Sequence, residues 1–149
     1  MSHTVKVNSV PIKSINALTC AVNELKQQGV NCDLKTNTQP RMYYKDQHGI
    51  CDYVLRLHDS PYDVGFDYNK EDNVYNVVVD PWANKVGSQI GASCPIPKTD
   101  EEKARHCVGK LMQLYTKHTV IEAATQQGYT VEDAYLDSKN NYQVVVSVC

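Results

Sequence analysis

Three short strands and the turns between them are encoded in residues 53–79, which read YVLRLHDSPYDVGFDYNKEDNVYNVVV. The segment 53–57 places tyrosine and two leucines at alternate positions, as one face of a half-buried strand does. The segments 64–68 and 74–79 are also rich in β-branched and aromatic residues, and turns containing Asp, Ser, Pro and Asn separate the three. Links this short join neighbouring strands, so the stretch predicts an antiparallel meander.

Upstream of the meander, the pattern predicts a strand, a helix and further strands. The first strand covers residues 4–10 and is expected to stop at Pro11. Ser14 can cap a helix whose apolar residues recur every three or four positions, up to a closing glycine. Another strand follows at 30–35, and a strand from Arg41 to Lys45 is a further option.

Downstream of the meander, the segment 83–98 contains two glycines and two prolines and is interpreted as a loop. It is longer than most connections in compact domains, and such loops are often functional. A capping box then opens a helix over 100–127, in which β-branched residues around His118 favour a bend. Two strands, 129–136 and 142–148, complete the chain.

The order of elements decides the fold class. A strand and a helix precede four strands, and a long helix precedes the last two strands. Consecutive antiparallel strands with few helices are typical of α+β proteins. We therefore predict a single α+β domain over residues 1–149, with an antiparallel β-sheet and two helices packed on one face.

Composition and charge exclude several classes of protein. The net charge is −2 and no run of basic residues occurs, so binding to nucleic acid is not expected. No stretch of about 18 apolar residues is present, so no transmembrane helix is expected. The first residues lack the basic and apolar blocks of a signal peptide, which predicts a cytoplasmic protein with six free cysteines.

Candidate catalytic and metal-binding residues each have a structural interpretation. The aspartates of the meander (Asp52, Asp59, Asp63, Asp67 and Asp80) could bind a hard cation, but their spacing matches no calcium loop and suits strand ends. Cys94 is the best candidate nucleophile, yet no histidine is placed beside it by the sequence. We assign no catalytic residue, cofactor or metal ligand, and expect that the protein is not an enzyme.

The aromatic residues suggest a binding surface instead. The chain has ten tyrosines, one tryptophan and one phenylalanine, and tyrosines on a strand face can dock a partner or stack on bases. The alternative is that they are ordinary sheet residues. The candidate binding residues are His3, Tyr53, Tyr62, Asp63, Tyr68, Trp82 and His118.

Several motifs occur together in a familiar order. They are Met1-Ser2-His3, YDVGF at 62–66, VVVD at 77–80 followed by Trp82, KHTVIEA at 117–123, GYTV at 128–131 and the terminal strand 142–148. In this order they resemble the hypothetical chloroplast reading frame thirty-five family, also called domain of unknown function twelve fifty-seven. The chain departs from that pattern in its longer 83–98 segment and in its terminal Cys149.

The resemblance implies a small protein of a cyanobacterium, a plastid, another bacterium or a phage, encoded in bacteria beside AAA-type ATPases. It supplies no catalytic residue. We expect a non-enzymatic interaction or adaptor protein that engages a host or ATPase-type assembly. The alternative is a small-ligand or metal-binding protein, with a pocket near the long helix, close to His3, His118 and the Asp-rich strand ends. A homodimer through the edge strand 142–148 is also compatible with the pattern.

Overall fold

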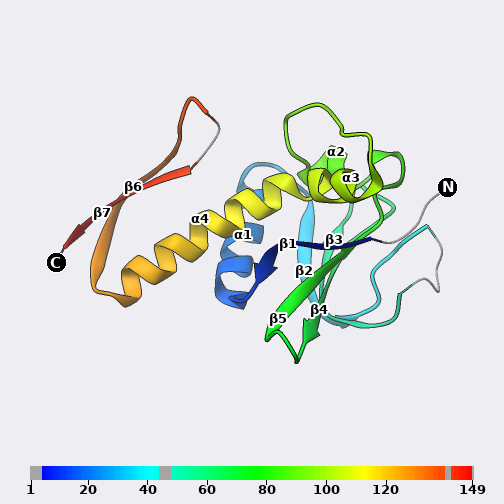
Figure 1. Cartoon of the computed structure of the whole chain (residues 1–149), viewed down its shortest axis with the longest axis horizontal. Helices are drawn as coiled ribbons and strands as arrows, with labels where there is room; N and C mark the ends of the chain where they lie inside the picture. Colours follow the sequence, from blue (N-terminus) through cyan, green and yellow to red (C-terminus); the bar gives the residue numbers. More distant parts are fainter. Residues whose placement is uncertain (1–4, 44–47, 140–141, 149) are drawn as a thin grey trace.

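The computed structural model describes residues 5–43, 48–139 and 142–148, and Figure 1 shows how their elements are arranged. The strands and the first helix follow one another in the predicted order, whereas the region after the meander contains more helices than predicted. They are β1 (Val5–Ile12), α1 (Ile15–Gln27), β2 (Cys32–Thr38), β3 (Cys51–Leu57), β4 (Val64–Asn69), β5 (Val74–Val79), the 3-10 turn η1 (Trp82–Asn84), α2 (Gly87–Ile90), α3 (Asp100–Cys107), α4 (Gly109–Gln126), β6 (Tyr129–Leu136) and β7 (Tyr142–Val148).

The meander forms the centre of a five-stranded antiparallel sheet. Its strand order is β1-β5-β4-β3-β2, so consecutive strands β2 to β5 are neighbours and β1 joins at the β5 edge. The last two strands pair with each other in a separate two-stranded sheet. The α+β class predicted from the sequence is confirmed.

One face of the five-stranded sheet carries the main hydrophobic core. Register places Leu55 beside Val64, and Phe66 beside Val77, on this face. These residues form one buried cluster with apolar side chains of α1, α2, α3 and the first half of α4. Burial of such side chains is the main force that holds the helices on the sheet.

On the opposite face, a smaller set of buried residues is covered by the described parts (39–43 and 48–50) of the connection between β2 and β3, which spans residues 39–50. Val54, Gly65 and Val78 lie side by side across β3, β4 and β5 on this face. They are buried with Met42 and Cys51 but lie outside the main cluster. The connection therefore packs on the sheet, and it brings its own side chains next to β3 and β4.

Two strand predictions need correction. Pro11 does not stop β1, which continues to Ile12. Because β1 is an edge strand with a register shift between Val7 and Ile12, the missing amide hydrogen of proline is tolerated. No strand is present at 41–43, while positions 44 and 45 of that prediction lie outside the described residues.

The predicted long helix is interrupted at Val108, and not bent near His118. Val108 leaves the helical conformation between α3 and α4, whereas α4 runs through His118 without a break. A Cβ atom on Gly109 would lie 2.7 Å from the Cβ of Ala92, so the chain needs a glycine where it approaches the preceding segment. The hydroxyls of Thr116 and Thr119 donate to carbonyls of the previous turn, which keeps them inside the helix.

The segment 83–98 contains α2 and is held against α3. The amide of Ala92 donates to the carbonyl of His106 (2.9 Å), and His106 Nε2 lies 2.7 Å from the carbonyl oxygen of Cys94. The loop prediction is therefore wrong for residues 87–90, and the segment is anchored at two further points.

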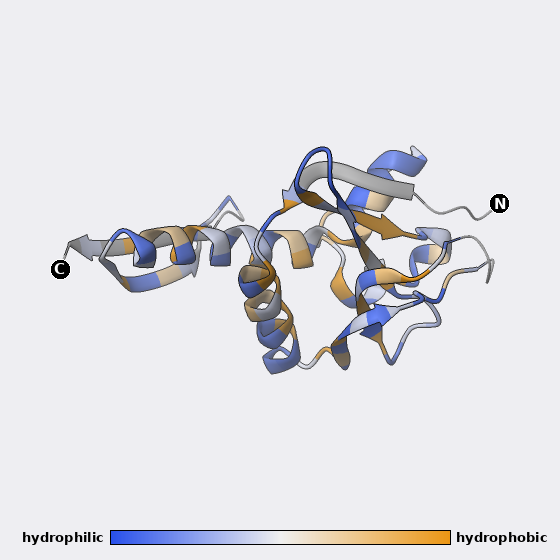
Figure 2. Ribbon diagram, turned by 90° about the horizontal axis from the view of Figure 1, so that it is seen from below, coloured by the Kyte–Doolittle hydropathy of each residue, from blue (hydrophilic) through white to orange (hydrophobic). Residues whose placement is uncertain are grey.

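The second half of α4 and the β6–β7 hairpin extend to one side of the five-stranded sheet, which both views show (Figures 1 and 2). The buried residues of α4 all belong to its first half: Leu111, Met112, Leu114 and Tyr115. Among the described residues, no helix combines the length and apolar character needed to cross a membrane.

Candidate functional site

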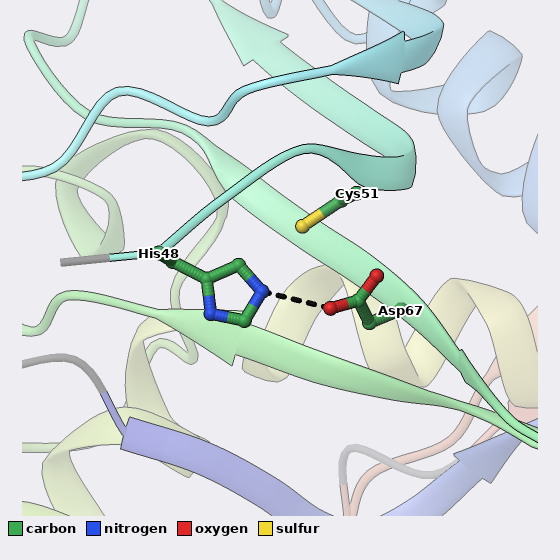
Figure 3. Close-up of side chains that lie close together, drawn as sticks. All are labelled: His48, Cys51 and Asp67. Atoms are coloured by element: carbon green, nitrogen blue, oxygen red, sulfur yellow. Dashed lines mark hydrogen bonds and ion pairs between the residues drawn. The ribbon is translucent and has the colours of Figure 1, made fainter. Parts of the chain in front are cut away.

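Three side chains of the kinds that bind metals meet on the smaller face of the sheet. His48 comes from the 39–50 connection, Cys51 from the first residue of β3, and Asp67 from β4 (Figure 3). His48 Nε2 lies 2.8 Å from Asp67 Oδ2, and one ligand atom from each of the three residues lies within 4.8 Å of the others. We call this group the His–Cys–Asp cluster.

Local features of the chain fix each member of the cluster. Gln39 Nε2 donates to the carbonyl oxygen of His48 (3.0 Å), which closes the connection on itself. Gly65 provides the space for the thiol, because a Cβ atom at this position would lie 2.7 Å from Cys51 Sγ. The sulfur is therefore enclosed, whereas the side chains of His48 and Asp67 are 20% and 36% exposed.

The surroundings of Cys51 decide its chemistry. Burial, together with the charges of Asp67 and Asp52, raises the pKa of the Cys51 thiol to about 12. A thiol with this pKa is protonated at neutral pH and is a poor nucleophile. The cluster does not have the properties of a cysteine–histidine catalytic pair.

A second feature is a pair of exposed aromatic rings, Tyr43 and Trp82. Their ring centroids are 5.8 Å apart in an edge-to-face arrangement, and the residues are 50% and 41% exposed. The fully buried carboxylate of Asp80 holds both backbones: Oδ2 accepts from the amide of Tyr43 (3.1 Å) and Oδ1 from the amide of Trp82 (3.0 Å). We call these two rings the aromatic pair.

The backbone directly after Trp82 is strained. Ala83 and Asn84 have φ values of 50° and 52°, in the left-handed region that residues with a Cβ atom rarely occupy. Each such residue costs on the order of 1 kcal/mol. Strain of this kind is often found at functional sites, and here it lies in the two residues that directly follow Trp82.

An open pocket lies at the start of the segment that carries Tyr43. Its volume is about 370 Å³, and its lining residues are Gln39, Pro40, Arg41, Met42 and Pro61. Pro40 also packs near Gly65, beneath the His–Cys–Asp cluster. The 39–50 connection thus contributes to the pocket, the cluster and the aromatic pair.

Comparison with protein families identifies the chain. Residues 21–145 match the family described as "Protein of unknown function (DUF1257)". The chain belongs to this family. The match spans most of the sequence, in agreement with the resemblance drawn from its motifs. No match was found among curated proteins or among solved structures.

The structure of this DUF1257 protein separates the residues proposed from its sequence. Trp82 and Tyr68 are exposed, whereas Tyr62 and Asp63 are buried. Tyr53 is half-buried and contacts Tyr75 edge to face, with ring centroids 5.6 Å apart. His3 lies outside the described residues.

His118 has a structural role in this DUF1257 protein. Its Nε2 lies 3.0 Å from Glu24 Oε1, and Lys117 Nζ lies 2.7 Å from the same oxygen. These contacts connect α4 to α1 at the helix–helix interface. Ser14 reinforces the interface by donating to the carboxylate of Glu122 (2.9 Å). The described geometry therefore explains His118 without a ligand.

The Glu24 contacts predict a pH-dependent stability. Burial would raise the pKa of Glu24, but hydrogen bonds from Lys117 and His118 outweigh it and hold the pKa below the ordinary value of 4.5. A carboxylate with a lowered pKa stabilises the fold fully above its unfolded pKa, and this contribution is lost as the pH falls through the folded pKa. We expect Glu24→Gln to be less stable than the wild type at about pH 6 and the difference to shrink toward about pH 3. Urea unfolding at several pH values measures this.

The exposed Glu71 provides the control for Glu24. Glu71→Gln should leave the pH dependence of the free energy of unfolding unchanged. A stability difference between wild type and Glu24→Gln that stays constant over the acidic range would contradict the assignment.

Sequence reasoning missed the His–Cys–Asp cluster as a site. His48 was not considered, and Asp67 was interpreted as a strand-end residue. One signal was available: His48 and Cys51 are separated by two residues, which is a spacing of ligand pairs in zinc sites. The third member comes from another strand, so only the fold reveals it.

Proposed function

We propose that this DUF1257 protein is a non-enzymatic interaction protein that docks a protein partner through the aromatic pair. The proposal rests on one observation. The buried carboxylate of Asp80 accepts hydrogen bonds from the backbone amides of two exposed aromatic residues and so holds them next to each other. Tyrosine and tryptophan are enriched among the residues that dominate binding energy in protein interfaces.

Preorganisation makes this surface suitable for binding. The two rings already contact each other, and the buried carboxylate of Asp80 holds the backbone amides of both residues. Binding of a partner therefore costs less side-chain conformational entropy than binding to a flexible loop would. The neighbouring pocket adds Arg41, a residue type that is also common in interface hot spots.

The family resemblance supports a more specific setting. We propose that the chain comes from a cyanobacterium, its phage or a plastid lineage, and acts in the cytoplasm. We also propose that its partner is a host assembly of the AAA-type ATPase class, beside which bacterial relatives are encoded. Burial raises the pKa of the thiols of Cys32, Cys51 and Cys107, so these three side chains are poor nucleophiles.

The test uses Trp82→Ala and Tyr43→Ala in affinity purification from a lysate of the source cells. Each substitution should reduce recovery of the wild-type partner by at least about tenfold, as expected for loss of a hot-spot residue. Tyr135→Ala serves as the matched control, because Tyr135 is also an exposed tyrosine, at 47%, but lies on the β6 hairpin.

Because Trp82 is the single tryptophan, its fluorescence reports directly on the surface. Addition of the purified partner to the wild type should change this emission. Equal partner recovery by the wild type, Trp82→Ala and Tyr43→Ala would contradict the proposal. Loss of recovery by Tyr135→Ala alone would move the interface to the hairpin.

A further inference from the structure

We propose that His48, Cys51 and Asp67 bind a divalent transition-metal ion of the Zn²⁺ type. The inference goes beyond the proposed docking function and does not depend on it. It rests on three ligand-type side chains from three segments of the chain that converge on one point (Figure 3). Each offers a different ligand atom: an imidazole nitrogen, a sulfur and a carboxylate oxygen.

The distances require only small movements. Tetrahedral zinc, with bonds of about 2.0 Å to nitrogen and oxygen and 2.3 Å to sulfur, places its ligand atoms roughly 3.3–3.6 Å apart. His48 Nε2 and Asp67 Oδ2 are now 2.8 Å apart, and all three atoms lie within 4.8 Å of each other. The nitrogen and oxygen must separate by about half an ångström, and the sulfur must approach the other two atoms by at most roughly 1.3 Å.

The mixture of ligand atoms selects the class of metal. Sulfur and imidazole disfavour Ca²⁺ and Mg²⁺, which take oxygen ligands, and suit zinc and its neighbours in the first transition row. Formation of the metal–sulfur bond releases the proton of the Cys51 thiol to solvent. Because His48 and Asp67 are partly exposed, solvent can supply the fourth ligand.

A bound ion would fasten the 39–50 connection to the sheet. His48 belongs to the connection, while Cys51 and Asp67 belong to β3 and β4, which are neighbours in the sheet. The same connection carries Tyr43, five residues before His48. The metal would therefore stabilise the segment on which one half of the aromatic pair depends.

A simple histidine–carboxylate pair is the competing explanation, and the chain contains a matched example. His58 Nε2 lies 2.7 Å from Asp33 Oδ2, with Lys26 Nζ 3.3 Å from the other oxygen of Asp33. This pair is exposed and belongs to no metal-type cluster among the described residues. It has the same two ligand types at nearly the same distance, so it serves as the internal control.

The experiment is a titration of the chelator-treated full chain with Co²⁺, followed by Zn²⁺. The wild type should show a thiolate-to-cobalt charge-transfer band at one equivalent of metal, and Zn²⁺ should abolish it by displacement. Cys51→Ser should lose the band, and both Cys51→Ser and His48→Ala should weaken binding by at least about 100-fold, the upper end of the cost of removing a residue that only supports a ligand. His58→Ala should bind Co²⁺ as the wild type does.

The outcomes separate the two explanations. A band that persists in Cys51→Ser, or equal weakening by His58→Ala and His48→Ala, overturns the proposal. Absence of a band in the wild type also overturns it. Circular dichroism shows whether each variant folds. If Cys51→Ser does not fold, His48→Ala still tests the site, because it changes a partly exposed residue of the connection.

Discussion

Replacement of Asp63 with alanine is expected to lower the free energy of unfolding by about 3–5 kcal/mol, because it removes the buried acceptor of two backbone amides and of Arg41. The carboxylate is fully buried. It accepts from the backbone amide of Arg41 (2.8 Å), from Arg41 Nη2 (2.8 Å) and from the amide of Leu57 (3.2 Å). Arg56 Nε lies 3.0 Å away at an ion-pair distance, although without hydrogen-bond geometry.

The expected cost follows from what the substitution leaves behind. Without Asp63, the guanidinium groups of Arg41 and Arg56, whose side chains are 39% and 27% exposed, lose their shared anionic partner, and the amides of Arg41 and Leu57 lose their acceptor. An unsatisfied buried donor costs about 1–3 kcal/mol, so the two amides account for most of the expected loss. Asp63 also fixes Arg41 and hence the beginning of the 39–50 connection.

Urea unfolding monitored by circular dichroism measures the effect of Asp63→Ala. Asp33→Ala is the control, since Asp33 pairs with Lys26 at the surface, where an ion pair contributes little to stability. Losses of similar size in the two variants would show that the Asp63 network is not a principal support of the fold.

The comparison of Asp63 with Trp82 shows what the sequence can and cannot predict. Both were among the candidate binding residues proposed from the sequence. Trp82 is exposed as expected, but Asp63 is covered by Arg41, which lies 22 residues earlier and pairs with it across the fold. Local patterns show no sign of such a partner, because the contact is formed between segments that are distant in the chain.

The boundaries of strands and helices can likewise be predicted where local sequence determines them, but not where contacts between distant segments do. The strands of the meander follow from alternation within each segment, so β3, β4 and β5 are close to their predicted limits. The break at Val108 depends on the contact between Gly109 and Ala92, and the extension of β1 through Pro11 depends on its edge position. Both are consequences of tertiary structure.

Phe66→Ala is expected to lower the free energy of unfolding by about 3–5 kcal/mol, the usual cost of removing a phenylalanine ring from a core. Phe66 lies in β4, the middle strand of the five, and is fully buried. Tyr53 and Val77 flank it in register on the face that carries the helices. Because neighbours on three sides belong to regular elements, the cavity cannot collapse without moving the sheet or a helix.

Tyr68 is the matched control for Phe66 because it lies two residues later on the same strand and face. It is 41% exposed, and its ring centroid is 5.2 Å from that of Tyr75. Tyr68→Ala should therefore cost only about 0.5–1.5 kcal/mol, the range for an aromatic pair contact. Alternation alone predicts the same role for Phe66 and Tyr68, because both face the same side of the sheet. A much larger loss of unfolding free energy in Phe66→Ala than in Tyr68→Ala would show that the hydrophobic core ends between these two residues. Equal losses would show instead that Tyr68 contributes to the core as Phe66 does, which would contradict its assignment as an exposed sheet residue.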